Sequence, residues 1–82
     1  MPKFMDSHVL KGAKPETLEK LQNEPKDEFG VKHLNLIYNE DEDRMYCVLD
    51  APNKEAVKKH HDKLGYKCDF IMEVDTTGDY TD

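Results

Sequence analysis

Asp6 and His8 stand two residues apart near the start of the sequence. Apolar and polar residues alternate over residues 3–10, a pattern that favours a β-strand, so the two side chains lie on one side of it. Imidazole and carboxylate groups bind transition metal ions, and the same pair can transfer protons. The spacing therefore indicates either a metal site or an acid–base site.

Three further residues could extend this pair. Cys47 lies in a later β-rich segment, and Asp69 and Glu73 share one parity of the last predicted strand. If the first strand is central in the sheet, these side chains lie near His8. Imidazole, carboxylate and thiolate together suit a borderline transition ion such as nickel or zinc.

His60 and His61 occupy the last turn of a predicted helix, where a histidine cation is stabilised by the helix C-terminus. Adjacent residues on a helix diverge, so we expect one of them to point inward and the other to be solvated. Either could bind a metal at the surface.

The elements that must position these residues follow from local signals. A helix opens at Pro15 and ends near Pro25, and Asn53 caps a second helix that Gly65 terminates. Strands are expected over residues 3–10, 31–38, 44–50 and 67–74, and helices after Pro15 and over 54–64. The order β-α-β-β-α-β predicts an α+β, ferredoxin-like fold with two helices on one face of an antiparallel sheet. Residues 1–75 form a single domain, and residues 76–82 form a polar tail or a short edge strand.

The alternation within the strands also predicts two faces. Pairing Tyr38 with Arg44 across the polar turn sets the register of the hairpin. Alternate residues then fall on two faces, and we assign the set with fewer polar side chains to the core beneath the helices. That parity comprises Met5, Val9, Leu34, Leu36, Tyr46, Val48, Cys68, Phe70, Met72 and Val74. The open face is then expected to carry Asp6, His8, His33, Asn35, Cys47, Asp69 and Glu73, with Phe4, Leu10, Ile37, Met45, Leu49 and Ile71 between them. A half-apolar open face rarely stays bare, which predicts a homodimer through it.

Composition excludes several classes of protein. The 82 residues carry 12 Lys and Arg against 18 Asp and Glu, a net charge of 12 − 18 = −6, which disfavours nucleic-acid binding. No apolar run approaches the roughly 18 residues of a membrane span, and the first residues lack a signal peptide's apolar segment. Cys47 and Cys68 form no CxxC pair, so reduced thiols in a cytoplasmic protein are expected.

The assembled motifs resemble a family of small ferredoxin-like proteins, long catalogued as a domain of unknown function, with a nickel-binding branch. The matching residues are Met1-Pro2-x-Phe4-Met5-Asp6-x-His8, Cys47, Ala51-Pro52, Ala56-Val57, His61-x-x-x-Gly65 and Asp69-x-Ile71-x-Glu73-Val74. They span roughly residues 1–74, and their order and spacing are more specific than any single motif.

This resemblance implies a homodimer with surface nickel sites that acts in metal sequestration or homeostasis. Asp6, His8, Cys47, His61, Asp69 and Glu73 match family positions and are carried over as candidate ligands, with His8 and His61 as the imidazoles. His33, His60, the acidic turn and the TTGDYTD tail stand outside the pattern.

Three functional hypotheses follow. The first is a non-enzymatic protein that binds nickel or another divalent transition metal. The second is a small dimeric enzyme in which His8 and a carboxylate transfer protons on the open sheet face. The third is an interaction module whose open face only forms the dimer.

Overall fold

The computed structural model describes residues 2–78 and shows the expected order of elements. Within these residues the elements are β1 (Lys3–Val9), α1 (Pro15–Asn23), β2 (Lys32–Asn39), β3 (Arg44–Asp50), α2 (Lys54–Leu64) and β4 (Phe70–Val74). The predicted tail includes residues 79–82, which lie outside the described residues. Residues 75–78 contain no helix or strand. Neither described helix is long and apolar enough to cross a membrane.

The helix ends form where the local signals place them. Pro15 occupies the first turn of α1, where its missing N–H costs no hydrogen bond. The Asn53 side chain accepts a hydrogen bond of 2.9 Å from the Ala56 N–H and caps α2. Gly65 ends α2 in the left-handed region at φ +79°, a conformation that glycine adopts without a Cβ penalty.

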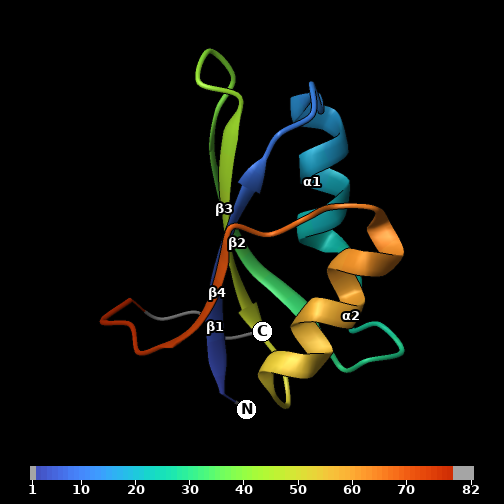
Figure 1. Cartoon of the computed structure of the whole chain (residues 1–82), viewed down its shortest axis with the longest axis vertical. Coiled ribbons are helices and arrows are strands. Elements are labelled where there is room, and N and C mark those ends of the chain that lie inside the picture. The colour runs from blue at the N-terminus through green and yellow to red at the C-terminus, as the bar shows by residue number, and fades with distance from the viewer. Residues whose placement is uncertain (1, 79–82) are drawn as a thin grey trace.

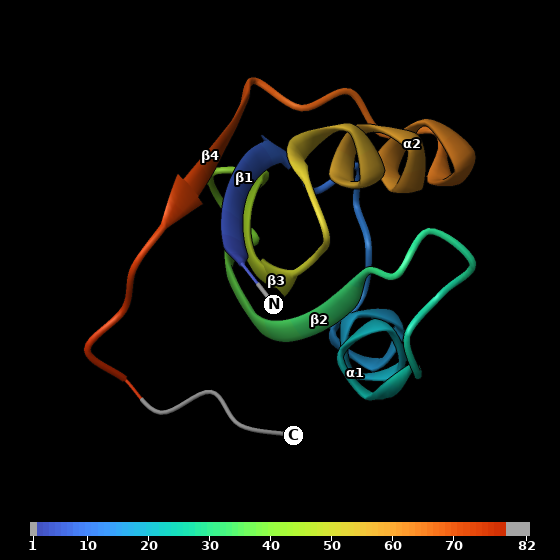
Figure 2. The same ribbon diagram turned by 90° about the horizontal axis from the view of Figure 1, so that it is seen from below.

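The four strands form one antiparallel sheet in the order β2-β3-β1-β4. Both helices lie on the same side of this sheet, which is seen edge-on in Figure 1 and from below in Figure 2. Helix α1 packs against β2, and α2 packs against β4. The ferredoxin-like α+β fold is therefore confirmed, with β1 between β3 and β4.

The prediction of which face lies beneath the helices was wrong. On β1, β3 and β4, the parity that we expected on the open face is the one that faces the helices: Phe4, Asp6 and His8 of β1 are 3%, 0% and 2% exposed. In the second half of β2 the expected faces hold, since Ile37 is 51% exposed and Leu36 packs against the core. Phe70 and Met72, expected in the core, are 41% and 51% exposed. The hydrophobic core is formed by Phe4, Leu10, Leu18, Val31, Met45, Cys47, Leu49, Ala51, Ala56 and Val57.

The physical reason lies in the mixed character of the buried parity. Met45, Leu49 and Phe4 are large apolar side chains whose burial contributes roughly 1.5–3 kcal/mol each. The polar residues between them are buried as well, because every second side chain of a strand points to the same face of the sheet. The number of polar residues on each face was therefore a poor guide to which face is buried.

The β2–β3 hairpin also differs from its predicted register. Asn39, rather than Tyr38, pairs with Arg44, so Leu36 lies opposite Cys47 and Asn35 opposite Val48. A β-bulge between His33 and Asn35 then restores the expected pairing of His33 with Leu49. A shift of one residue reverses the faces, which is why Asn35 and His33 have different surroundings.

Candidate metal centre

Four buried side chains from three elements meet between the sheet and α2. Asp6 and His8 come from β1, Cys47 from β3 and His61 from α2. One ligand-capable atom of each lies within 4.8 Å of the corresponding atoms of the other three. We refer to these four residues as the DHCH cluster.

Sheet pairing and helix caps position the DHCH cluster. Asp6 lies directly opposite Cys47 in the β1–β3 ladder, and His8 follows Asp6 on the same face. His61 stands one helical turn after Val57, which is fully buried, so the inward face of α2 directs the imidazole at the sheet. Two capped helix ends and a central strand thus fix the four side chains.

Both imidazoles of the cluster are oriented by backbone carbonyls. His8 Nδ1 lies 2.8 Å from the Val9 carbonyl oxygen, and His61 Nδ1 lies 2.9 Å from that of Val57. A carbonyl only accepts, so each Nδ1 carries the proton and donates it. Metal-binding histidines in proteins show the same arrangement, because the outer hydrogen bond fixes the ring and directs Nε2 toward the ion.

The Asp6 carboxylate lies between these two Nε2 atoms. Oδ2 is 3.2 Å from His61 Nε2, and Oδ1 is 3.8 Å from His8 Nε2. Neither oxygen has a partner in hydrogen-bond geometry among the described residues, although Asp6 is fully buried. Buried carboxylates are normally hydrogen-bonded or bound to a cation, so these two oxygens indicate a position for a positively charged ligand.

The spacing of the donor atoms fits one metal ion. Donors bound tetrahedrally at 2.0–2.3 Å lie roughly 3.3–3.8 Å apart. The separations from Asp6 fall in or near that range, and His8 Nε2 is 3.7 Å from Cys47 Sγ. The ring centres of His8 and His61 are 5.3 Å apart, close to the upper end of the roughly 4.6–5.3 Å expected for two imidazoles on one ion.

The protonation states of the cluster follow from its burial. Burial alone would lower the pKa of His61, but the adjacent Asp6 carboxylate and the sulfur atoms of Cys47 and Cys68 raise it to about 12. Burial raises the pKa of the Cys47 thiol to about 12 and lowers the pKa of His8. The metal-free cluster therefore holds an Asp6–His61 ion pair, a neutral His8 and a protonated Cys47.

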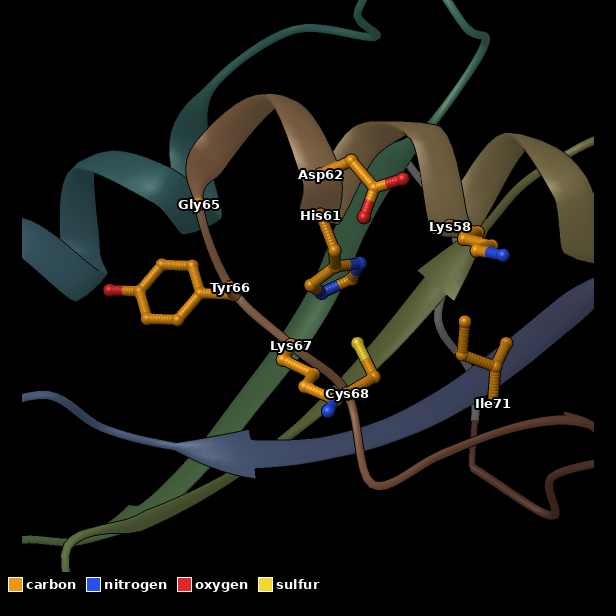
Figure 3. A pocket seen from close by; sticks show the side chains of 8 residues that line it. All are labelled: Lys58, His61, Asp62, Gly65, Tyr66, Lys67, Cys68 and Ile71. Carbon is orange, nitrogen blue, oxygen red and sulfur yellow. The ribbon is translucent and has the colours of Figure 1, made fainter.

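A pocket of about 560 Å³ borders the cluster at His61. Figure 3 shows it beside the C-terminal end of α2, with the His61 imidazole and the Cys68 sulfur pointing toward each other. Cys68, expected in the core, is only half-buried and lines this pocket with Tyr66. Of the four cluster residues, His61 is the one that lines this pocket, so the cluster borders the pocket at that imidazole.

A family described as "Nickel responsive protein SCO4226-like" matches residues 4–74. The chain belongs to this SCO4226-like family. Searches of curated proteins and of solved structures gave no match.

All six candidate residues lie within the stretch that matches the SCO4226-like family, and the structure brings four of them together. Asp69 and Glu73 stand apart from the DHCH cluster. Asp69 precedes β4, is exposed, and forms an ion pair with Arg44. Glu73 is exposed on β4 opposite Phe4.

Tyr66 is a neighbour of the cluster that sequence reasoning did not identify. Its ring lies over His8 with centres 4.5 Å apart, and the Lys11 Nζ atom lies over the Tyr66 ring at 5.2 Å from its centre. Its position directly after Gly65 could have indicated this contact, because the residue that follows a left-handed helix end often packs back against the protein. The tyrosine ring therefore packs against one of the four cluster residues.

Proposed function

We propose that this protein binds a divalent transition metal ion, nickel foremost, through Asp6, His8, Cys47 and His61. The observation that carries the proposal is the buried Asp6 carboxylate, which has no hydrogen-bond partner among the described residues and stands between two oriented imidazoles and a thiol. The family description, nickel responsive, supports nickel as the ion. The proposed role is metal sequestration or homeostasis.

Charge balance supports a divalent ion. In the metal-free cluster the negative Asp6 is balanced by the His61 cation. A divalent ion would be balanced by Asp6 and the Cys47 thiolate, with both histidines neutral. The buried site has zero net charge in both states, so binding introduces no uncompensated charge into the low-dielectric interior.

The donor set favours a borderline ion over a hard one. Two imidazoles, one thiolate and one carboxylate suit nickel, zinc or cobalt, whereas magnesium and calcium prefer oxygen ligands throughout. We propose nickel within this group because of the family description, and zinc is the alternative that a tetrahedral arrangement would favour.

The decisive experiment compares two aspartate variants by calorimetry with Ni²⁺, Zn²⁺ and Co²⁺ added to chelator-treated protein. Asp6→Asn keeps the shape of the side chain and removes its charge. We expect it to weaken binding by more than the roughly 10–100-fold caused by loss of an outer hydrogen-bond partner of a ligand. Asp69→Asn, in the exposed Arg44 pair, is the matched control and should leave the affinity unchanged.

Two outcomes would contradict the proposal. Heats equal to the buffer blank for all three ions would exclude a transition-metal site of useful affinity. Equal losses in Asp6→Asn and Asp69→Asn would place the ligands elsewhere. Circular dichroism of each variant checks that the fold is intact.

The enzymatic alternative placed a proton-transfer site on the open face of the sheet, and the structure does not place His8 and Asp6 there. His8 and Asp6 face the helices rather than the open sheet face, and both are buried. An acid–base role would therefore have to operate through the pocket beside His61. The metal proposal requires no substrate and accounts for a buried Asp6 carboxylate whose oxygens accept no hydrogen bond among the described residues, so we favour it.

We further propose that a second copy of the chain covers the open face of the sheet, in the cytoplasm. The exposed side chains of Ile37, Phe70 and Met72 support this face as the contact. The free thiols of Cys47 and Cys68 suit a reducing compartment. The net charge of −6 supports partners other than nucleic acid.

A further inference from the structure

A second histidine cluster lies next to the first. His60 on α2 contacts His33 on β2, with ring centres 5.0 Å apart, and it also contacts Asp27 in the segment between α1 and β2. Both imidazoles are buried, at 6% exposure for His33 and 7% for His60. These three residues belong to no part of the DHCH cluster.

Asp27 holds the His60 ring in a defined orientation. Its Oδ2 lies 2.5 Å from His60 Nδ1. Its Oδ1 accepts hydrogen bonds from the backbone N–H groups of Phe29, at 2.9 Å, and Val31, at 3.0 Å. A carboxylate fixed by two backbone donors accepts the Nδ1 proton, which leaves the lone pair of His60 on Nε2.

His60 Nε2 itself has no hydrogen-bond partner among residues 2–78. The side chain of His60 is only 9% exposed, so solvent does not compensate for the missing bond. A buried nitrogen without a partner is uncommon and indicates a ligand at that position. The carboxylate–imidazole arrangement is the one that presents Nε2 to metal ions in proteins.

We propose that His33 and His60 bind a second divalent transition metal ion, with Asp27 as the positioning residue for His60. Two imidazoles on one ion at about 2.1 Å place their ring centres roughly 4.6–5.3 Å apart. The observed 5.0 Å falls within this range. Nickel, zinc and copper accept imidazole ligands, and water would complete the coordination.

Two protein ligands make this a weaker and more exchangeable site than the DHCH cluster. His60 and His61 are consecutive on α2, and their ring centres are 5.2 Å apart. The same helical turn thus presents one imidazole to each cluster. The two sites share no ligand, so a substitution at a ligand of one removes no ligand of the other.

The test counts bound ions by native mass spectrometry and calorimetry with Ni²⁺ and Zn²⁺. The wild-type protein should bind two ions per chain, with distinct affinities. His33→Asn and His60→Asn should each retain only the tighter ion. Asp6→Asn should retain only the weaker one, which separates the two sites.

Asp27→Asn tests the positioning role. We expect it to weaken the second ion by roughly 10–100-fold and to leave the first unchanged. Because His60→Asn removes a buried contact and could unfold the chain, ¹⁵N NMR of the wild-type imidazoles provides a second measurement. Saturating Zn²⁺ should shift His60 Nε2 and one ring nitrogen of His33.

The outcomes separate this inference from the proposed function. Unchanged His60 and His33 resonances at saturating Zn²⁺ would overturn the second site, as would a single ion per wild-type chain that only Asp6→Asn abolishes. A single ion that only His33→Asn or His60→Asn abolishes would support the second site and refute the first.

Discussion

At the scale of single residues, Asp6 has the most unusual environment in the described chain. It is fully buried, it forms an ion pair with His61, and its oxygens have no partner in hydrogen-bond geometry among the described residues. A buried carboxylate that accepts no hydrogen bond retains part of its desolvation cost even when an ion pair balances its charge. A bound cation would remove this cost, and the protons of the neighbouring ligands then determine how binding depends on pH.

We predict that each nickel ion displaces about two protons at pH 7. One leaves His61 and one leaves Cys47, since both groups have a pKa of about 12 in the metal-free protein. Because protons compete with the metal, the affinity falls as pH falls. Calorimetry in buffers of different ionisation enthalpy measures the number of protons released.

The matched variant is Cys47→Ser, which removes the thiol and should reduce the release to about one proton per ion. A release of two protons in both proteins would show that Cys47 keeps its proton and is not a ligand.

Stability in acid is predicted to depend on His33. Burial lowers the pKa of His33 to about 4 from its ordinary value of 6.5, so between these values the unfolded chain binds more protons than the folded one. Stability therefore falls as the pH drops from 6.5 to 4, by about 3 kcal/mol from this residue. His61 has the opposite shift, and its contribution is present in full throughout this window.

The measurement is urea unfolding of chelator-treated protein at pH 7 and pH 4. His33→Gln cannot be protonated and should lose most of this difference, whatever its stability at pH 7. An equal acid loss in both proteins would assign the effect to other groups, of which the neutral His8 is the first candidate.

At the scale of elements, α2 organises both histidine clusters. Its capped N-terminus at Asn53 and left-handed end at Gly65 fix its length, and its last turn carries His60 and His61. The two side chains diverge as adjacent helical residues must, one toward β2 and one toward β1. We expected one histidine to be solvated, but both are buried: His61 packs against the sheet at His8, and His60 contacts His33 of β2 and Asp27 of the segment before it.

We predict that Gly65→Ala destabilises the protein by about 1–2 kcal/mol, because an L-residue at φ +79° is strained although its Cβ meets no atom within 4 Å. Gly65→Asn should lose less, since asparagine tolerates the left-handed region. Urea unfolding of the two variants measures the difference. Equal losses would show that the cost is not conformational strain.

At the scale of the whole molecule, the outer face of the sheet carries exposed apolar side chains. The registers place Ile37, Tyr46 and Phe70 in one row across the strands, and Met5, Val48 and Met72 in the next. Ile37, Phe70 and Met72 expose 51%, 41% and 51% of their surface. A second copy of the chain would bury these rows.

We predict that the wild-type protein sediments as a dimer and that Met72→Glu sediments as a monomer, because a charge in the apolar contact would lose its hydration. Leu64→Glu is the control: Leu64 is exposed to 41%, but it lies at the end of α2 on the opposite side of the sheet. Analytical ultracentrifugation distinguishes the states. A monomeric wild-type protein, or a dimeric Met72→Glu, would contradict this contact.

The sequence by itself determined the elements and their order. Pro15, Asn53 and Gly65 act on the backbone within a few residues, so helix ends can be recognised from local sequence. The spacing of Asp6 and His8 likewise placed them on one face of a strand, because the side chains of a strand alternate whatever its surroundings. The ferredoxin-like order follows from these signals alone.

Only the tertiary structure decided which face is buried and which residues meet. The choice between the two faces depends on the summed packing of Phe4, Met45 and Leu49 against helices distant in sequence, and the bulge at His33 changes the register within one strand. His61 joined Asp6 while Asp69 and Glu73 remained outside, because cluster membership depends on how α2 crosses the sheet. Such contacts between distant segments are set by long-range packing, which local sequence signals do not encode.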